Sequence, residues 1–136
     1  MRRSNILLVD DDQVYLYLMN RVIKGLTEDL EVNSFTDGEQ AIHFLSLCTS
    51  ENIKLPEVIF LDINMPFLDG WGFLAEFKKL KPKIKDKINI YMVSSSNREQ
   101  DIQRAEEFEE LTGYVVKPVQ EDQLVEIFAN VYEQNW

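Results

Sequence analysis

VIFLD, residues 58–62, is a run of four apolar residues that ends at a single carboxylate. A short, continuously apolar run bounded by polar residues is typical of a strand covered on both faces of a sheet. The segment Ile6-Leu7-Leu8-Val9 repeats this pattern and ends at Asp10-Asp11-Asp12. Two buried strands that both end at aspartates predict acidic groups at one edge of a sheet.

Helical patterns separate the strand-like runs. Val14, Leu18, Val22 and Leu26 recur every four residues and predict one apolar face of a helix that ends near Gly25. Asp37 predicts the N-cap of a second helix. The other expected elements are strands at Glu31–Phe35, Ile88–Val93 and Tyr114–Val116, and helices at Trp71–Leu80, Arg98–Leu111 and about Leu124–Val131.

The alternation of strands and helices indicates the fold class. Parallel strands need crossover helices, and continuously apolar strands need helices on both faces of the sheet. We therefore expect an α/β protein with a doubly wound, five-stranded parallel sheet and five helices. Functional groups in such sheets gather outside the carboxyl ends of the strands.

Polar side chains follow four of the five expected strands: Asp10 and Asp11, then Asp62, Ser94 and Lys117. Turns favour aspartate in any protein, so each residue alone is weak evidence, whereas the full set is specific. Like charges ~4 Å apart repel by roughly 4 kcal/mol even at an effective dielectric of ~20. A divalent cation would relieve that repulsion, and oxygen ligands without a His or Cys cluster favour Mg²⁺.

Composition limits the classes of protein and partner. The 136 residues, 45% of them hydrophobic, predict one domain spanning 1–136, with no residues left for an output domain. A net charge of −10 argues against nucleic acid or an anionic membrane as partner. The single cysteine, Cys48, cannot form an internal disulfide, and no apolar run is long enough for a signal peptide or membrane span. We expect a cytoplasmic protein.

Four motifs carry a resemblance to the receiver domains of two-component response regulators, especially the stand-alone chemotaxis type. The resemblance spans nearly the whole chain, and the motifs match in order and spacing. It implies the flavodoxin-like strand order 2-1-3-4-5 for the sheet. They are Ile6-Leu7-Leu8-Val9-Asp10-Asp11; Val58 to Pro66 with Asp69-Gly70; Met92-Val93-Ser94-Ser95; and Gly113-Tyr114-Val115-Val116-Lys117-Pro118.

The resemblance implies a phosphoacceptor and its metal ligands. Asp62 would accept the phosphoryl group. Asp11, Asp62 and the backbone carbonyl of Asn64 would hold Mg²⁺, with Asp10 acting mainly through water. Asp12 would have no role in the site.

The resemblance also implies how the phosphoryl group is held and sensed. Ser94 would donate a hydrogen bond to the phosphoryl oxygens, and Lys117 would pair with them as a cation. Tyr114 is similar to the aromatic residue that changes rotamer on activation. The Lys117-Pro118 peptide bond is expected to be cis.

The implied function is signalling rather than turnover of a separate substrate. A histidine kinase or phosphotransfer protein would supply the phosphoryl group, and the chain would catalyse its own phosphorylation and dephosphorylation. The surface of the fourth helix, fifth strand and fifth helix would then control binding to a downstream protein, which the sequence does not identify.

Three other functions fit these residues less well. A haloacid-dehalogenase-like phosphatase needs an acid/base aspartate where this chain has Asn64, and no cap domain is available. A flavodoxin-like flavin protein needs phosphate-binding donors where the first loop is acidic. A pseudo-receiver that only docks is disfavoured by the acidic pair and Lys117.

Two segments depart from a simple match. Receivers usually carry a Gly-Ala step before the fifth strand, whereas this chain has Glu110-Leu111-Thr112, so the end of the fourth helix is expected to differ. Six lysines lie between Lys78 and Lys87, at the expected opposite end of the sheet, and predict a solvated surface rather than a binding patch.

Overall fold

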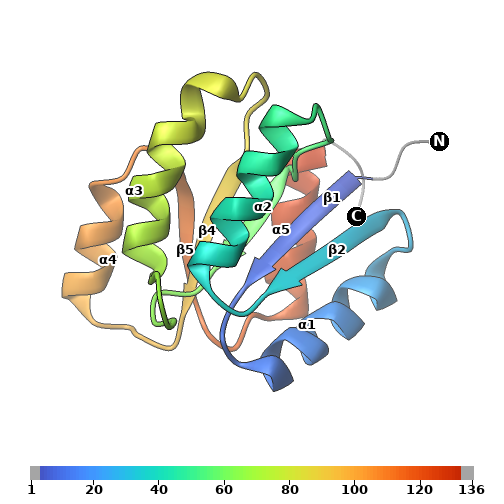
Figure 1. The fold of residues 1–136 in the computed structure, drawn as a ribbon. Helices are drawn as coiled ribbons and strands as arrows, with labels where there is room; N and C mark the ends of the chain where they lie inside the picture. Colours follow the sequence, from blue (N-terminus) through green and yellow to red (C-terminus); the bar gives the residue numbers. More distant parts are fainter. Residues whose placement is uncertain (1–3, 133–136) are drawn as a thin grey trace.

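The computed structural model describes residues 4–132, which form a parallel sheet between two layers of helices (Figure 1). The strands are β1 Ser4–Val9, β2 Leu30–Phe35, β3 Val58–Leu61, β4 Asn89–Ser94 and β5 Leu111–Val116. The helices are α1 Gln13–Leu26, α2 Gly38–Ser50, α3 Gly70–Leu80, α4 Glu99–Glu106 and α5 Glu121–Tyr132, with a 3₁₀ turn η1 at Lys81–Lys83.

The strand order is β2-β1-β3-β4-β5, and every pair is parallel, which confirms the expected topology. The reversal of order lies between β1 and β3. In their registers Val9 pairs with Leu61, and Ser94 pairs with Val116. The residues that follow these strands are therefore brought to one edge of the sheet.

Two apolar clusters cover the two faces of the sheet, as the continuously apolar strands predict. Alternate residues of each strand point to opposite faces. In β3, Ile59 and Leu61 face α2, α3 and α4, whereas Val58 and Phe60 face α1 and α5. All four of these β3 side chains are buried, so the strand that carries Asp62 lies in the centre of the fold.

The packed face of α1 differs from the expected one. Val14, Leu18 and Val22 are 68%, 54% and 38% exposed, while the helix packs through Leu16, Met19 and Ile23. The helix carries apolar residues on two faces, and packing against the sheet and α5 buries the face that contains Leu16, Met19 and Ile23. The face predicted from the four-residue repeat is thus largely exposed.

The fourth helix ends earlier than predicted, at Glu106 rather than Leu111. Backbone bonds from Phe108 to Ala105 and from Leu111 to Phe108 form turns after it, and Leu111 already pairs with β4. A register shift follows between Ile90 and Tyr91 on β4. The predicted boundary of the fourth helix was therefore wrong by about five residues.

Other local expectations are confirmed. The Asp37 side chain accepts a hydrogen bond from the backbone N–H of Gln40 and caps α2. The Lys117-Pro118 bond is cis. Within residues 4–132, no helix has the length and apolar character needed to cross a membrane.

Candidate functional site

Backbone hydrogen bonds extend the sheet by one residue beyond its strands and fix the candidate site. The Asp62 N–H donates to the carbonyl of Val9 at 2.9 Å, and the Lys117 N–H donates to the carbonyl of Ser94 at 2.8 Å. The Asp10 N–H donates in the same way to Phe35 at 3.0 Å. The side chains at this edge are therefore anchored by rigid strands rather than by free loops.

Three carboxylates meet at this edge. Asp10, Asp11 and Asp62 each offer an oxygen, and these atoms lie within 4.8 Å of one another. Asp10 and Asp62 are only 2% and 7% exposed, whereas Asp11 is exposed. Because buried carboxylates this close repel one another, the cluster requires positive charge nearby.

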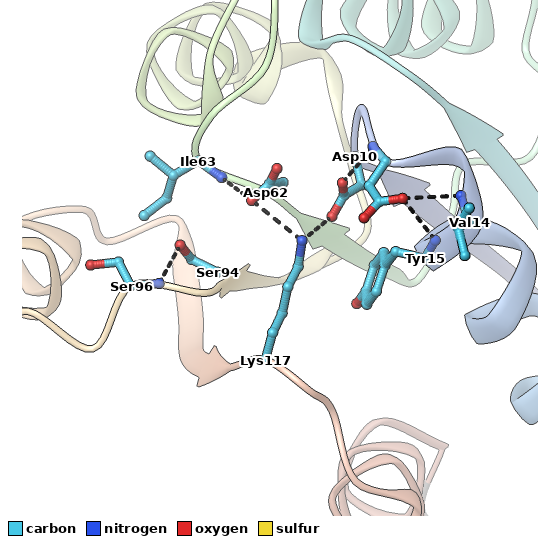
Figure 2. A network of polar contacts seen from close by, with 9 residues as sticks. Asp10, Val14, Tyr15, Asp62, Ile63, Ser94, Ser96 and Lys117 are labelled. Carbon is cyan, nitrogen blue, oxygen red and sulfur yellow. Dashed lines mark hydrogen bonds and ion pairs between the residues drawn. The ribbon is translucent and has the colours of Figure 1, made fainter.

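Lys117 supplies part of that charge. Figure 2 shows its ammonium between two acids: Nζ lies 2.6 Å from Asp10 Oδ2 and 3.7 Å from Asp62 Oδ1. The other oxygen of Asp10 accepts a hydrogen bond from the Asp12 N–H at 2.9 Å. Asp10 is thus the more fully paired acid, and Asp62 retains more acceptor capacity.

The environment perturbs the acidity of Asp62. Burial, followed by the neighbouring Asp10 carboxylate, raises the pKa of Asp62 to about 6, although Lys117 and the Ile63 N–H act in the opposite direction. The Ile63 N–H donates to Asp62 Oδ1 at 2.9 Å. At neutral pH the carboxylate is therefore mostly ionised but poorly hydrated, which favours reaction with an electrophile or binding of a cation.

The loop after β3 returns to the Asp62 backbone. Gly70 N–H donates to the carbonyl of Ile63 at 2.7 Å, and a Cβ added at Gly70 would collide with the carbonyl oxygen of Asp62. Asp69 caps α3 by accepting from Gly72 at 2.8 Å. Only glycine at position 70 allows this close approach, which places the N-terminus of α3 beside Asp62.

Asn64 lies exposed in the same loop. It lines a hollow of about 520 Å³, which also contains Asp69, Trp71 and Ser96. Residues 95–98 of the β4–α4 loop form another side of this hollow. The carbonyl of Asn64 as a metal ligand stays a prediction.

Ser94 and Tyr114 are linked through Ser96. The Ser94 hydroxyl oxygen, buried at the end of β4, accepts a hydrogen bond from the Ser96 N–H at 3.1 Å. The Tyr114 hydroxyl donates to the Ser96 carbonyl at 2.9 Å, and the Tyr114 ring packs against the α2–α3–α4 cluster. The ring is already partly buried in this structure, so its expected inward movement remains untested.

Sequence reasoning missed two residues near the site. Ser96 was not singled out, although it ends the run Ser94-Ser95-Ser96 in the loop after a strand. Tyr15 was not singled out either; its ring centroid lies 4.3 Å from Lys117 Nζ. Burial raises the pKa of the Tyr15 hydroxyl well above its usual range, and the Asp10 and Asp62 carboxylates add to the shift. Its place three residues after Asp12, in the first turn of α1, was the available signal.

Asp12 has a structural position that the sequence did not assign. Its side chain is the N-cap of α1 and accepts hydrogen bonds from Val14 and Tyr15 N–H at 3.0 and 3.1 Å. One of its carboxylate oxygens is therefore engaged at the helix terminus, and its expected lack of a metal-binding role stays a prediction.

The donor set fits a hard divalent cation. The cluster offers carboxylate oxygens, one of them exposed, and no His or Cys joins it among the described residues. Mg²⁺ and Mn²⁺ both accept such ligands and keep several waters. A doubly wound parallel sheet with carboxylates at the carboxyl ends of its strands places this chain among the α/β proteins whose functional groups lie at the switch point of the sheet.

Within that class the family is shown by comparison. The chain belongs to the response regulator receiver domain family, whose pattern matches residues 6–129. Phosphorylation of an aspartate in the presence of a divalent ion is general to this family, as is interaction with kinases or phosphotransfer proteins. The suggested family is therefore confirmed.

Individual relatives agree with this assignment. Response regulator Rcp1 from Synechocystis is 37% identical over 98 residues, which are 71% of this chain and 65% of Rcp1. The plant response regulator ARR19 from Arabidopsis thaliana is 28% identical over 96% of this chain but only 28% of its own length. The matched region thus spans less than two thirds of both relatives.

Solved structures share the whole fold. A two-component response regulator from Cytophaga hutchinsonii superposes with a TM-score of 0.85 at 30% identity, covering 98% of this chain and all of the other. The Mn²⁺-bound form of Rcp1 superposes at 0.77 with 28% identity, covering 98% and 96% of the two chains. That relative therefore binds a divalent ion on a closely similar framework.

Proposed function

We propose that this chain accepts a phosphoryl group on Asp62 from a histidine kinase or phosphotransfer protein in the cytoplasm, with Mg²⁺ as cofactor. The observation that carries the proposal is the position of Asp62: a buried carboxylate, 3.7 Å from Lys117 and within 4.8 Å of two further acids, at the end of the central strand. Family membership supports the same chemistry.

The transfer is a nucleophilic substitution at phosphorus. An oxygen of the ionised Asp62 attacks the phosphorus of a phosphohistidine, the P–N bond breaks, and the imidazole nitrogen leaves with the electron pair. The product is an acyl phosphate on Asp62. The poor hydration of this carboxylate favours attack, because less water has to be removed from the nucleophile.

Charge compensation comes from groups at the strand ends. Asp11, Asp62 and the Asn64 carbonyl would hold the cation, with Asp10 adjoining it, and a bound divalent ion supplies positive charge toward the phosphoryl oxygens. The Lys117 ammonium, which is paired with Asp10 here, can pair with a phosphoryl oxygen as well. The Ser94 hydroxyl can donate to another oxygen, since its oxygen only accepts from Ser96 here.

The same groups support loss of the signal. Water attacks the phosphorus of the acyl phosphate, the P–O bond to Asp62 breaks, and inorganic phosphate leaves while the carboxylate is regenerated. The chain thus catalyses its own phosphorylation and dephosphorylation without being an enzyme for a separate substrate.

A route to an output surface is present in the β4–α4 loop. If Ser94 turns toward a phosphoryl group, its hydrogen bond from Ser96 changes, and Ser96 also accepts from Tyr114 on β5 and donates to Asp101 on α4. We infer that the α4–β5–α5 surface controls binding of a downstream protein. The net charge of −10 disfavours nucleic acid or an anionic membrane there.

The proposal is tested by labelling. Wild type and Asp62→Asn are incubated with Mg²⁺ and acetyl phosphate, and the modified residue is located by mass spectrometry; beryllofluoride binding is measured in parallel. Wild type is expected to gain one acid-labile phosphoryl group on Asp62, and the variant none.

Asp69→Asn is the matched control. It makes the same chemical change in the same loop, and asparagine caps a helix about as well as aspartate. It should be labelled like wild type. Undiminished labelling of Asp62→Asn at another residue would contradict the assignment.

A further inference from the structure

Lys117 contacts a third group besides its two acids. Its Nζ lies 4.3 Å from the centroid of the Tyr15 ring, within the range in which an aromatic face attracts a cation. Figure 2 shows the ring beside the Lys117 side chain, on the side of Asp10. The ammonium is therefore bounded by Asp10, Asp62 and an aromatic face.

The two ion pairs alone favour one of the acids. Lys117 Nζ is 2.6 Å from Asp10 and 3.7 Å from Asp62, and a lysine carries a compact charge on a flexible stem. Nothing in that pairing prevents the ammonium from remaining with Asp10. A third contact restricts the lysine stem. The position of that contact therefore decides where the ammonium lies before a phosphoryl group arrives.

Tyr15 is held in place from two sides. Its backbone N–H donates to the side chain of Asp12 at 3.1 Å, in the first turn of α1, and its side chain packs against the apolar cluster between the sheet and helices α1 and α5. Among the described residues, its hydroxyl oxygen is buried and has no hydrogen-bond partner. The hydroxyl therefore does not anchor this ring, and the specific polar interaction of the side chain is the one between its face and Lys117.

We propose that Tyr15 is a positioning residue whose aromatic face holds the Lys117 ammonium between Asp10 and Asp62 for phosphoryl transfer. The inference rests on the proposed phosphoacceptor function and adds a residue that acts on the transfer through Lys117. The ring face, rather than the hydroxyl, performs the role.

Two substitutions separate the ring from the hydroxyl and from simple packing. Tyr15→Phe keeps the aromatic face and removes the unpartnered hydroxyl, whereas Tyr15→Leu keeps an apolar side chain and removes the face. Tyr17→Leu is the matched control, because Tyr17 lies on the same helix but is 60% exposed, and its ring lies against Arg21 instead. Urea unfolding of all variants reports any loss of packing.

Two measurements test the proposal. The first is the rate of Asp62 labelling by acetyl phosphate at saturating Mg²⁺. We expect Tyr15→Leu to be about three- to tenfold slower, the size of effect that loss of a partly desolvated cation–π contact produces, with Tyr15→Phe and Tyr17→Leu near wild type. The second is the NMR shift of the Lys117 methylene protons next to Nζ, which the ring current should move upfield in wild type and Tyr15→Phe but not in Tyr15→Leu.

Three outcomes would overturn the proposal. A wild-type labelling rate in Tyr15→Leu would mean that the ring only packs in the core and does not position Lys117. Equal slowing in Tyr15→Phe and Tyr15→Leu would assign the effect to the hydroxyl. Absence of a ring-current shift in wild type would remove the contact itself. Failure of the proposed function is distinct, because wild type would then remain unlabelled at Asp62 even if the ring-current shift were present.

Discussion

The two ends of the sheet carry charge in opposite ways. At the carboxyl end, the buried acids Asp10 and Asp62 share Lys117, whose side chain is 16% exposed. At the other end, all six lysines from Lys78 to Lys87 are exposed, as expected of a solvated surface, and Lys79 pairs with Glu76 at 2.8 Å in solvent. The fold removes water from one set of charges and leaves the other hydrated.

This difference separates stability from function. Exposed pairs add little because water screens them, whereas buried pairs recover only part of the desolvation cost of their charges. Burial of the charges at the carboxyl end therefore costs stability. The same burial leaves Asp62 poorly hydrated and therefore reactive.

The largest effect is expected from the lysines. In chelator at pH 7.5, Lys117→Met should lower the free energy of unfolding by about 3 kcal/mol, because two buried carboxylates lose their cation. Lys79→Met should change it by less than about 0.5 kcal/mol. Urea unfolding measures both. Similar losses in the two variants would mean that the carboxyl end is as well hydrated as the other.

The next effect concerns pH. The pKa of Asp62 is raised to about 6, so the unfolded chain releases this proton at lower pH than the folded one. The resulting stability is fully present below about pH 4 and is lost as pH rises through about 6. Measured in chelator, the stability of Asp62→Asn relative to wild type should increase by about 2 kcal/mol between pH 4 and 7. A pH-independent difference would contradict the desolvation of Asp62.

Substitution of the neighbouring residues Asp11 and Asp12 should distinguish metal binding from helix capping. Asp11→Ala should weaken Mg²⁺ binding by at least about tenfold, because it removes an oxygen of the acidic cluster. Asp12→Ala should leave the Mg²⁺ dissociation constant within about twofold but lower stability by about 1 kcal/mol through loss of the α1 cap. Calorimetric titration and urea unfolding measure the two quantities. Equal losses of Mg²⁺ affinity would show that the register of the β1–α1 loop is misassigned.

The smallest effect is expected at Ser94. Ser94→Ala should still be labelled at Asp62, but beryllofluoride should perturb the amide shifts around Tyr114 less than in wild type, since one hydrogen bond of about 1 kcal/mol is lost from the activated state. Wild-type shift changes near Tyr114 in this variant would remove Ser94 from the proposed route to α4 and β5.

The strand-end residues were predictable because the carboxyl ends of parallel strands all lie at the same edge of the sheet. Each apolar run ends where its strand ends, so Asp10, Asp62, Ser94 and Lys117 had to meet at one edge. Their pairing was less predictable. The sequence does not show that Lys117 would lie 2.6 Å from Asp10 and 3.7 Å from Asp62, because that depends on the rotamer of a flexible side chain.

Two errors have the same physical origin. In α1, apolar residues occupy both faces, so a four-residue spacing through Val14, Leu18 and Val22 could not show which face packs. Near Leu111, the chain has enough helix-forming residues to extend α4, but pairing of Leu111 with β4 takes precedence. In both places tertiary packing decided between local alternatives of similar propensity.

The contact between Lys117 and Asp10 joins residues 107 positions apart in the sequence. During synthesis, a chain that ends before position 117 can form β1 through β4 but has no cation to pair with the acids it has buried. Such a truncated chain should depend on added Mg²⁺ for compactness more than the full chain does, which pulse proteolysis of chains ending before and after Lys117 can measure. The acidic cluster therefore gains its lysine only when β5, the last strand among residues 4–132, joins the sheet.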